Sequence, residues 1–116
     1  MQETSSILQW LSGFFDAEGC VRVNKCVRGT FTTYSPRLVI VNTNFNTIEF
    51  VVSFLSKLGI NCYVQTRHVT GNRIPCKVIE IGRVSKVFDA CLLMYNHSIT
   101  KKEELYLMSK FCYSRI

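Results

Sequence analysis

The chain lacks a long apolar run, a paired-cysteine spacing and a cluster of histidines. No apolar stretch approaches the roughly 18 residues that a membrane-spanning helix needs, so we expect no membrane segment. Six cysteines occur without a C-x-x-C pair, and His68 and His97 stand alone, which argues against a structural zinc site. The first residues include no basic segment of the kind that opens a secretory signal. We therefore expect an intracellular protein with reduced thiols, in an organelle, a prokaryote or a virus-infected cytoplasm.

Acidic residues are also scarce. Eight Asp and Glu stand against 14 Lys and Arg, which gives a formal net charge of +6. Such an excess of positive charge suits a polyanionic partner. A hydrophobic content of 47% in 116 residues excludes general disorder and predicts one globular domain over residues 1–116.

What the chain does have is a regular succession of helical and alternating patterns. Apolar residues at helical spacing predict helices over about residues 5–16, 48–58, 84–94 and 100–111. Alternation and turn residues predict two hairpins, with strands over about residues 20–28, 31–42, 61–69 and 74–81. The order αββαββα, followed by a terminal helix, predicts an α+β fold with helices packed on one face of the sheet.

Local signals predict where helices start and which residues face the core. The expected N-caps are, in chain order, Ser5 or Ser6, Asn46 or Thr47, and Thr100, the last in a capping box with Glu103. In the first strand the residues expected to face the core are Val21, Val23 and Val27.

The first helix ends in two carboxylates. Residues 11–19 read Leu-Ser-Gly-Phe-Phe-Asp-Ala-Glu-Gly, with Asp16 and Glu18 in the last turn and Gly19 as the stop. Acids at this end face the negative pole of the helix dipole, at a cost of roughly 0.3–1 kcal/mol each. A divalent cation would offset that cost. The stretch resembles the motif of the LAGLIDADG homing endonucleases, with Glu18 in place of the final aspartate.

The resemblance implies the homing-endonuclease fold, in which a saddle-shaped antiparallel sheet binds double-stranded DNA. It also implies cleavage with Mg²⁺, for which Mn²⁺ is expected to substitute. Glu18 is then the catalytic, metal-ligating acid, and the backbone carbonyl of Ala17 is a further ligand. Asp16 is either another metal ligand or a residue that caps or packs at the helix interface.

Two further catalytic positions follow from the same resemblance. Asn44 matches a polar position that organises water near the metal, although it is equally an ordinary turn residue. Lys101 or Lys102 matches a basic position that stabilises transition-state charge, although both residues equally suit a solvated first helical turn.

A single copy of the motif implies the single-motif, homodimeric type of this family, in which the motif helices of two chains lie side by side. Small side chains would let these helices approach closely. The residues expected at this dimer interface are Leu8, Leu11, Ser12, Gly13 and Phe15.

The outward positions of the predicted sheet are basic and polar, as a DNA-binding face requires. Arg reads guanine and Asn reads adenine, while other basic residues hold phosphates. A solvated sheet face also alternates, but this one has almost no acids, and Glu80 is expected inward or at the edge. Val39 and Val41 are also assigned to this face. The predicted DNA-binding residues are Arg22, Asn24, Cys26, Arg28, Ser35, Arg37, Gln65, Arg67, Arg73 and Lys77.

Together these features predict a site-specific DNA endonuclease. As a homodimer it would make metal-dependent double-strand breaks in a long, roughly palindromic target, as in intron homing. Two alternatives use the same fold: an RNA-binding intron maturase, with intron RNA as the partner, and a catalytically inactive DNA-binding protein. A small protein-interaction domain is an unrelated alternative, and it would show no salt-dependent affinity for nucleic acid.

Overall fold

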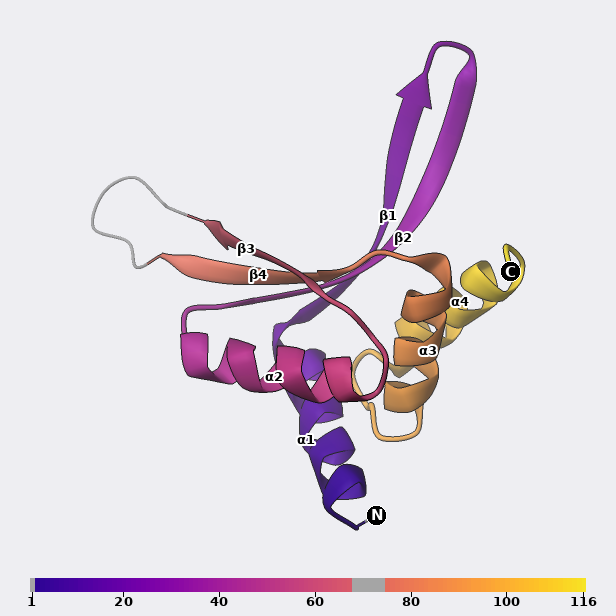
Figure 1. Cartoon of the computed structure of the whole chain (residues 1–116). Coiled ribbons are helices and arrows are strands. Elements are labelled where there is room, and N and C mark those ends of the chain that lie inside the picture. The colour runs from indigo at the N-terminus through magenta and orange to yellow at the C-terminus, as the bar shows by residue number, and fades with distance from the viewer. Residues whose placement is uncertain (1, 68–74) are drawn as a thin grey trace.

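The computed structural model describes residues 2–67 and 75–116 and contains one four-stranded antiparallel sheet with helices on one face (Figure 1). The predicted order of elements is confirmed, while the ends assigned to strands at 68–69 and 74 lie outside the described residues. The elements are α1 (Gln2–Glu18), β1 (Gly19–Arg28), β2 (Phe31–Asn42), α2 (Phe45–Lys57), β3 (Tyr63–Arg67), β4 (Cys76–Ile81), α3 (Val84–Tyr95) and α4 (Lys102–Tyr113).

The helix starts differ from the sequence prediction. Helix α1 begins before Ser5, so Ser5 and Ser6 lie inside it and are not N-caps. Helix α2 begins earlier than expected, with Asn44 as its N-cap: the Oδ1 atom of Asn44 accepts the Thr47 N–H at 3.1 Å. The prediction of Asn46 or Thr47 as the cap was therefore wrong, because the helix already begins at Phe45 and both residues lie inside its first turn.

The predicted capping box at the last helix is also wrong. Helix α4 begins at Lys102, and its cap residue Lys101 makes no side-chain capping hydrogen bond. Thr100 therefore precedes the cap, and its spacing from Glu103 does not serve this helix. The N–H groups of the turn just before α4 are satisfied from another part of the chain, as described below.

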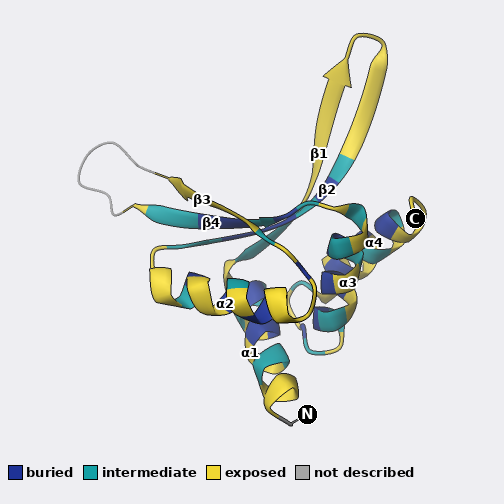
Figure 2. Cartoon of the chain, in the orientation of Figure 1, coloured by how far each residue is buried: buried dark blue, intermediate teal, exposed yellow. Residues whose placement is uncertain are grey.

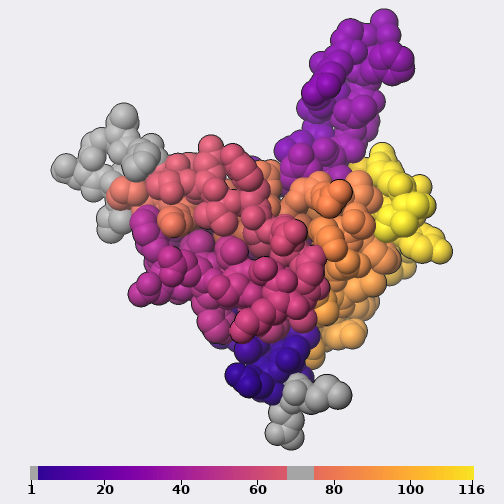
Figure 3. Space-filling model, in the orientation of Figure 1, coloured from indigo at the N-terminus to yellow at the C-terminus, as the bar shows by residue number. Residues whose placement is uncertain are grey.

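The sheet has the strand order β1-β2-β4-β3 and divides into two arms (Figure 1). Strand β2 pairs with β1 along the whole hairpin, but it pairs with β4 only over Leu38–Asn42. Beyond that segment the β1–β2 hairpin projects alone from the body of the molecule, as the space-filling view also shows (Figure 3). The second arm is formed by β3 and β4. The positive φ of Gly29, 61°, allows the tight turn of the first hairpin.

The hydrophobic core lies between the helices and the proximal part of the sheet (Figure 2). Each fully buried apolar side chain contributes roughly 1.5–3 kcal/mol, so the many residues here dominate stability. Main members from the sheet and all four helices, each 5% exposed or less, are Leu38, Ile40, Ile79, Ile81, Leu11, Phe15, Ile48, Val51, Val87, Cys91, Leu105 and Cys112.

The β1–β2 arm extends past this core. Val21 packs against the core, as predicted, but Val23 and Val27 are 47% and 60% exposed. The prediction that all three valines face the core was wrong for the latter two, because the hairpin continues beyond the helices. Among residues 2–67 and 75–116, no helix is both long and apolar enough to cross a membrane.

Candidate active site and nucleic-acid interface

The Asp16 carboxylate, in the last turn of α1, receives the first N–H groups of the segment that opens α4. Its oxygens accept the N–H of Ile99 at 2.7 Å, of Thr100 at 3.3 Å and of Lys101 at 3.1 Å. The hydroxyl of Ser98, a buried polar residue, also donates to Asp16. Asp16 thus anchors the turn that leads into α4, and it does so from a position more than 80 residues away in the chain.

This arrangement resolves the electrostatic problem of an acid at the end of a helix. Burial raises the pKa of Asp16, but the hydrogen bonds from Ser98 and from the Ile99, Lys101 and Thr100 N–H groups outweigh it and hold the pKa below its ordinary value of 3.8. The positive pole of α4 compensates the negative pole of α1. Both Asp16 oxygens are engaged within this chain, and the contacts therefore favour the alternative in which Asp16 caps or packs over the one in which it binds a metal.

The structure also brings Lys101 to the end of α1. Its Nζ atom donates to the main-chain carbonyl of Asp16 at 2.6 Å, where a cation is favourable for the helix dipole. The neighbouring Lys102 lies elsewhere, with its Nζ atom 4.8 Å from the centre of the Tyr95 ring. Of the two basic residues predicted for the site, Lys101 is therefore the one bonded to the motif.

Glu18 is the last residue of α1, and its side chain is exposed. Within the described part of the chain its carboxylate has no hydrogen-bond or ion-pair partner. The chain then turns directly into β1 at Gly19. A Cβ atom at Gly19 would lie 2.1 Å from the Phe15 ring, so only glycine fits this corner. The corner fixes the place of Glu18 at the junction of helix and sheet.

A single protomer does not enclose a metal ion. Over residues 2–67 and 75–116, no group of three or more His, Cys, Asp or Glu side chains could hold one. What the end of α1 offers is an exposed Glu18 carboxylate and the carbonyl of the exposed Ala17. These are hard oxygen donors of the type that Mg²⁺ prefers, and they fit part of its coordination shell. A metal ion held here would need further ligands from water, substrate or a second chain.

The predicted catalytic residue Asn44 lies at the start of α2. Its Oδ1 atom caps that helix through Thr47, and its own N–H donates to Oδ1 of Asn42 at 2.7 Å. The contacts of the described residues do not join Asn44 to Glu18.

The predicted dimer interface needs correction. Leu11, Ser12 and Phe15 are each 1% exposed or less within one protomer, so they belong to its own core. The Ser12 hydroxyl donates to the Leu8 carbonyl of the same helix. Gly13 lies on the opposite, exposed side of α1, and a Cβ atom there would meet nothing within 4 Å. The open face of α1 is centred on Gly13.

The strand register defines the outer face of the sheet, opposite the helices. Arg22 pairs with Arg37, Asn24 with Ser35 and Cys26 with Thr33. Arg28 follows on β1, and on β3 the same face includes Gln65 and Arg67. Eight of the ten predicted DNA-binding residues thus lie on one face, namely Arg22, Asn24, Cys26, Arg28, Ser35, Arg37, Gln65 and Arg67.

Two assignments on β4 were wrong. Lys77 pairs with Asn42 and shares the helix-side face with Ile79, and its Nζ atom lies 4.8 Å from the centre of the Phe45 ring. Glu80, expected inward or at the edge, lies on the outer face next to Val39. The sequence pattern does not reveal which β4 residues face the helices, because two adjacent residues of this strand are both buried. Arg73 lies outside the described residues.

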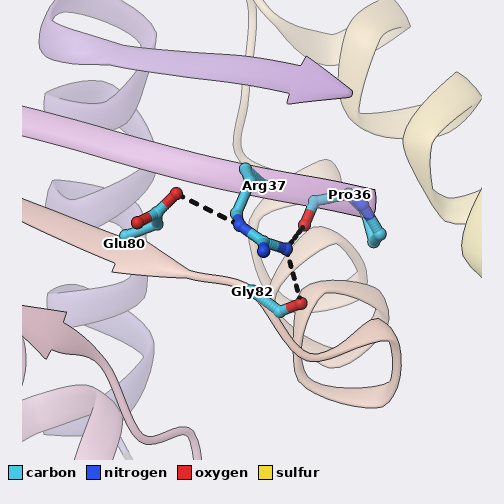
Figure 4. Close-up of polar contacts among 4 residues, drawn as sticks. All are labelled: Pro36, Arg37, Glu80 and Gly82. Atoms are coloured by element: carbon cyan, nitrogen blue, oxygen red, sulfur yellow. Dashed lines mark hydrogen bonds and ion pairs between the residues drawn. The ribbon is translucent and has the colours of Figure 1, made fainter. Parts of the chain in front are cut away.

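Arg37 differs from the other basic residues of this face because its guanidinium is already bonded (Figure 4). Its Nε atom lies 3.1 Å from Oε1 of Glu80. Its Nη1 atom donates to the carbonyls of Pro36 at 2.8 Å and Gly82 at 2.9 Å. Sequence analysis missed Ser98, Glu80 and Gly82 as partners, since nothing local marks a contact across the fold.

Comparison with known families identifies the class of protein. The model of the LAGLIDADG-like domain matches residues 5–90, and the chain therefore belongs to the LAGLIDADG family. Over 69 residues, 56% of its length, the chain is 39% identical to the uncharacterized protein MJ0314 of Methanocaldococcus jannaschii. It spans about a quarter of the length of that relative (25%).

Solved structures agree on the fold. The homing endonuclease I-CvuI, in complex with the I-CreI target, superposes with a TM-score of 0.77 and 13% identity over 96% of this chain and 68% of that one. The archaeal intron-encoded homing endonuclease I-Vdi141I, complexed with DNA, gives a TM-score of 0.75 and 16% identity over 94% and 68%. The chain thus has the fold of the LAGLIDADG homing endonucleases.

Proposed function

We propose that this chain is a site-specific DNA endonuclease that acts as a homodimer and makes double-strand breaks. The observation that carries the proposal is the unbonded Glu18 carboxylate, held at the junction between α1 and the basic face of the sheet. The clamp between Asp16 and the start of α4 holds this helix end in place. The DNA-bound homing endonucleases that share the fold support the same assignment.

The proposed metal site is shared between two copies. Glu18 and the Ala17 carbonyl of each protomer supply oxygen ligands, and two such helix ends meet when α1 packs against its symmetry mate through the face around Gly13. Two carboxylates at close range repel unless cations lie between them. Mg²⁺ fits these donors, and Mn²⁺ would substitute. When bound, the metal makes water more acidic and stabilises charge on the scissile phosphate.

The exposed basic residues of the outer face bind the duplex. Arg22, Arg28 and Arg67 hold phosphates or read guanine, and Asn24 is suited to adenine. Binding of this kind weakens steeply with salt because phosphate contacts release counterions. A two-fold dimer reads two inverted half-sites, so the target is long and roughly palindromic, as intron homing requires.

The remaining predicted residues take supporting roles in this proposal. Lys101, bonded to the Asp16 carbonyl at the end of α1, is the basic residue that stabilises transition-state charge on the phosphate, whereas Lys102 lies against Tyr95. Asn44 organises water at the edge of the site through its amide, while its Oδ1 atom caps α2.

The test is cleavage of a randomised duplex library with Mg²⁺. The wild type should give discrete double-strand cuts at one symmetric sequence, and Glu18→Gln should bind DNA but not cut it. Glu3→Gln, an exposed acid at the other end of α1, is the matched control and should cut normally.

Cleavage by Glu18→Gln at the wild-type rate would refute the site. Salt-sensitive DNA binding without any cuts would favour an inactive DNA-binding protein. Specific binding of host intron RNA that raises splicing would favour a maturase.

A further inference from the structure

The two arms of the sheet separate at one residue. Strand β2 pairs with β4 from Asn42 to Leu38, where Leu38 lies opposite Ile81. The next residue on β2 is Arg37, and the residue after Ile81 is Gly82, where β4 has ended. From Arg37 onward β2 pairs with β1 alone, and the two arms diverge (Figure 1).

The Arg37 side chain bridges the point where the arms separate, and both its Nε and its Nη1 atoms are engaged (Figure 4). The Nε atom forms an ion pair with Glu80, and Nη1 donates to the carbonyls of Pro36 and Gly82. A bidentate contact to guanine needs two adjacent nitrogens of the rigid fork, either Nε with Nη2 or Nη1 with Nη2. Each pair includes a nitrogen that is already engaged, so Arg37 has no free edge for reading a base.

The surroundings are shaped around this guanidinium. A Cβ atom at Gly82 would lie 3.0 Å from both Cζ and Nη1 of Arg37, so the absence of a side chain makes room for the contact. Arg37 pairs with Arg22 across β1 and β2, so two positive charges face each other there. The carboxylate of Glu80 neutralises the charge of Arg37. Arg22 remains the exposed cation at this level of the sheet.

We propose that Arg37, Glu80 and the Gly82 carbonyl form a latch that sets the angle between the two arms of the sheet. Arg37 is then a positioning residue of the nucleic-acid interface and does not read bases. The latch belongs to the free protein and does not depend on the proposed function. Its consequence for DNA affinity does rest on that function, because a duplex must contact both arms together.

The first test is nuclear magnetic resonance of the full chain without DNA. In the wild type the Arg37 Nε–H should exchange slowly with water, and residual dipolar couplings should give one fixed orientation of β1–β2 relative to β3–β4. Glu80→Gln should speed that exchange and change the orientation of the arms while the helices keep their signals. An unchanged orientation in Glu80→Gln would overturn the proposal.

Two further variants show whether a change in arm orientation comes from loss of the latch, from loss of a charge or from misfolding. Gly82→Ala alters no charge but displaces the guanidinium, and it should change the orientation of the arms as Glu80→Gln does. Glu49→Gln removes an exposed acid from α2, far from the latch in sequence, and should leave the arms unchanged. If exchange of the Arg37 Nε–H is faster in Gly82→Ala but the arms keep the wild-type orientation, the latch is refuted.

DNA affinity provides a second test, because the latch and a base-reading Arg37 predict changes of opposite sign for Glu80→Gln. If Glu80 merely restrained a base-reading Arg37, Glu80→Gln would bind DNA more tightly. The latch predicts weaker binding, matching the loss in Arg37→Ala to within about twofold, with no further loss in the double variant. Glu49→Gln corrects for the general effect of removing an acid. Tighter binding by Glu80→Gln would overturn the proposal. Absence of any DNA binding by the wild type would refute the proposed function, and the orientation measurement would still decide the latch.

Discussion

The two acids that end α1 have opposite environments although they lie two residues apart. Asp16 accepts four hydrogen bonds from residues 98–101, just before α4, whereas Glu18 has no partner in the described part of the chain. Two residues correspond to a rotation of about 200° around a helix, so the acids point to different sides. The comparison indicates that Asp16 stabilises the fold, whereas Glu18 lies uncompensated at the negative pole of the helix dipole, as expected of a group that binds a ligand.

The largest expected effect on stability comes from replacing the Asp16 carboxylate. Asp16→Asn places an amide against backbone N–H groups and removes the charge, so the free energy of unfolding should fall by about 2 kcal/mol. Chemical denaturation followed by circular dichroism measures this change. Glu18→Gln is the matched control at the same helix end. Equal stability of Asp16→Asn and the wild type would show that the clamp does not stabilise the fold.

The stabilising effect of Asp16 should depend on pH. Because its pKa is lowered in the folded protein, its contribution is full above the ordinary value of 3.8 and is lost as the pH falls through the lowered value. The stability difference between the wild type and Asp16→Asn should therefore be constant near neutrality and shrink in acid. Denaturation curves at a series of pH values test this. A difference that persists unchanged well below pH 3.8 would contradict the assignment.

Lys101 should have a smaller effect. Lys101→Met keeps the aliphatic chain but removes the ammonium group from the Asp16 carbonyl, and we expect a loss of about 1 kcal/mol. Lys102→Met is the control, since that ammonium contacts only the Tyr95 ring among the contacts described here. If both variants lost the same stability, the hydrogen bond from Lys101 to the Asp16 carbonyl would make no specific contribution to the fold.

The smallest expected effect has the opposite sign. Without divalent metal, Glu18→Gln should raise the free energy of unfolding by about 0.5 kcal/mol, because it removes an uncompensated negative charge from the end of a helix. Thermal unfolding of the metal-free protein measures it. A destabilised Glu18→Gln would mean that Glu18, like Asp16, supports the fold.

The order of elements and the position of Glu18 could be predicted because both follow from local patterns. Helical and alternating spacing identified each element, and the nine residues of the motif placed the acid at a helix end. The role of Asp16 stayed open at that stage because its partners Ser98 and Ile99 lie 82 and 83 residues away in the chain. Spacing within a segment does not encode contacts of this length.

The outer face could be predicted only in part for a similar reason. On β1 and β2 the polar alternation is regular, and Arg22 and Asn24 fall where expected. On β4, Val78 and Ile79 are both buried, so burial does not alternate along the strand and does not show which residues face the helices. A shift of one residue exchanges the faces of a strand, which misplaced Lys77 and Glu80.

Under the proposed function, the β1–β2 arm gives this protein freedom to change its DNA target. Every residue from 22 to 34 is exposed, and the arm extends past the core without helices beneath it (Figure 2). Substitutions at such positions usually alter stability by no more than about 0.5 kcal/mol. Selection can therefore vary the residues of this arm, which is the proposed recognition surface, while the core and the motif helix keep the fold. Randomised libraries confined to the arm are the natural starting point for altering specificity.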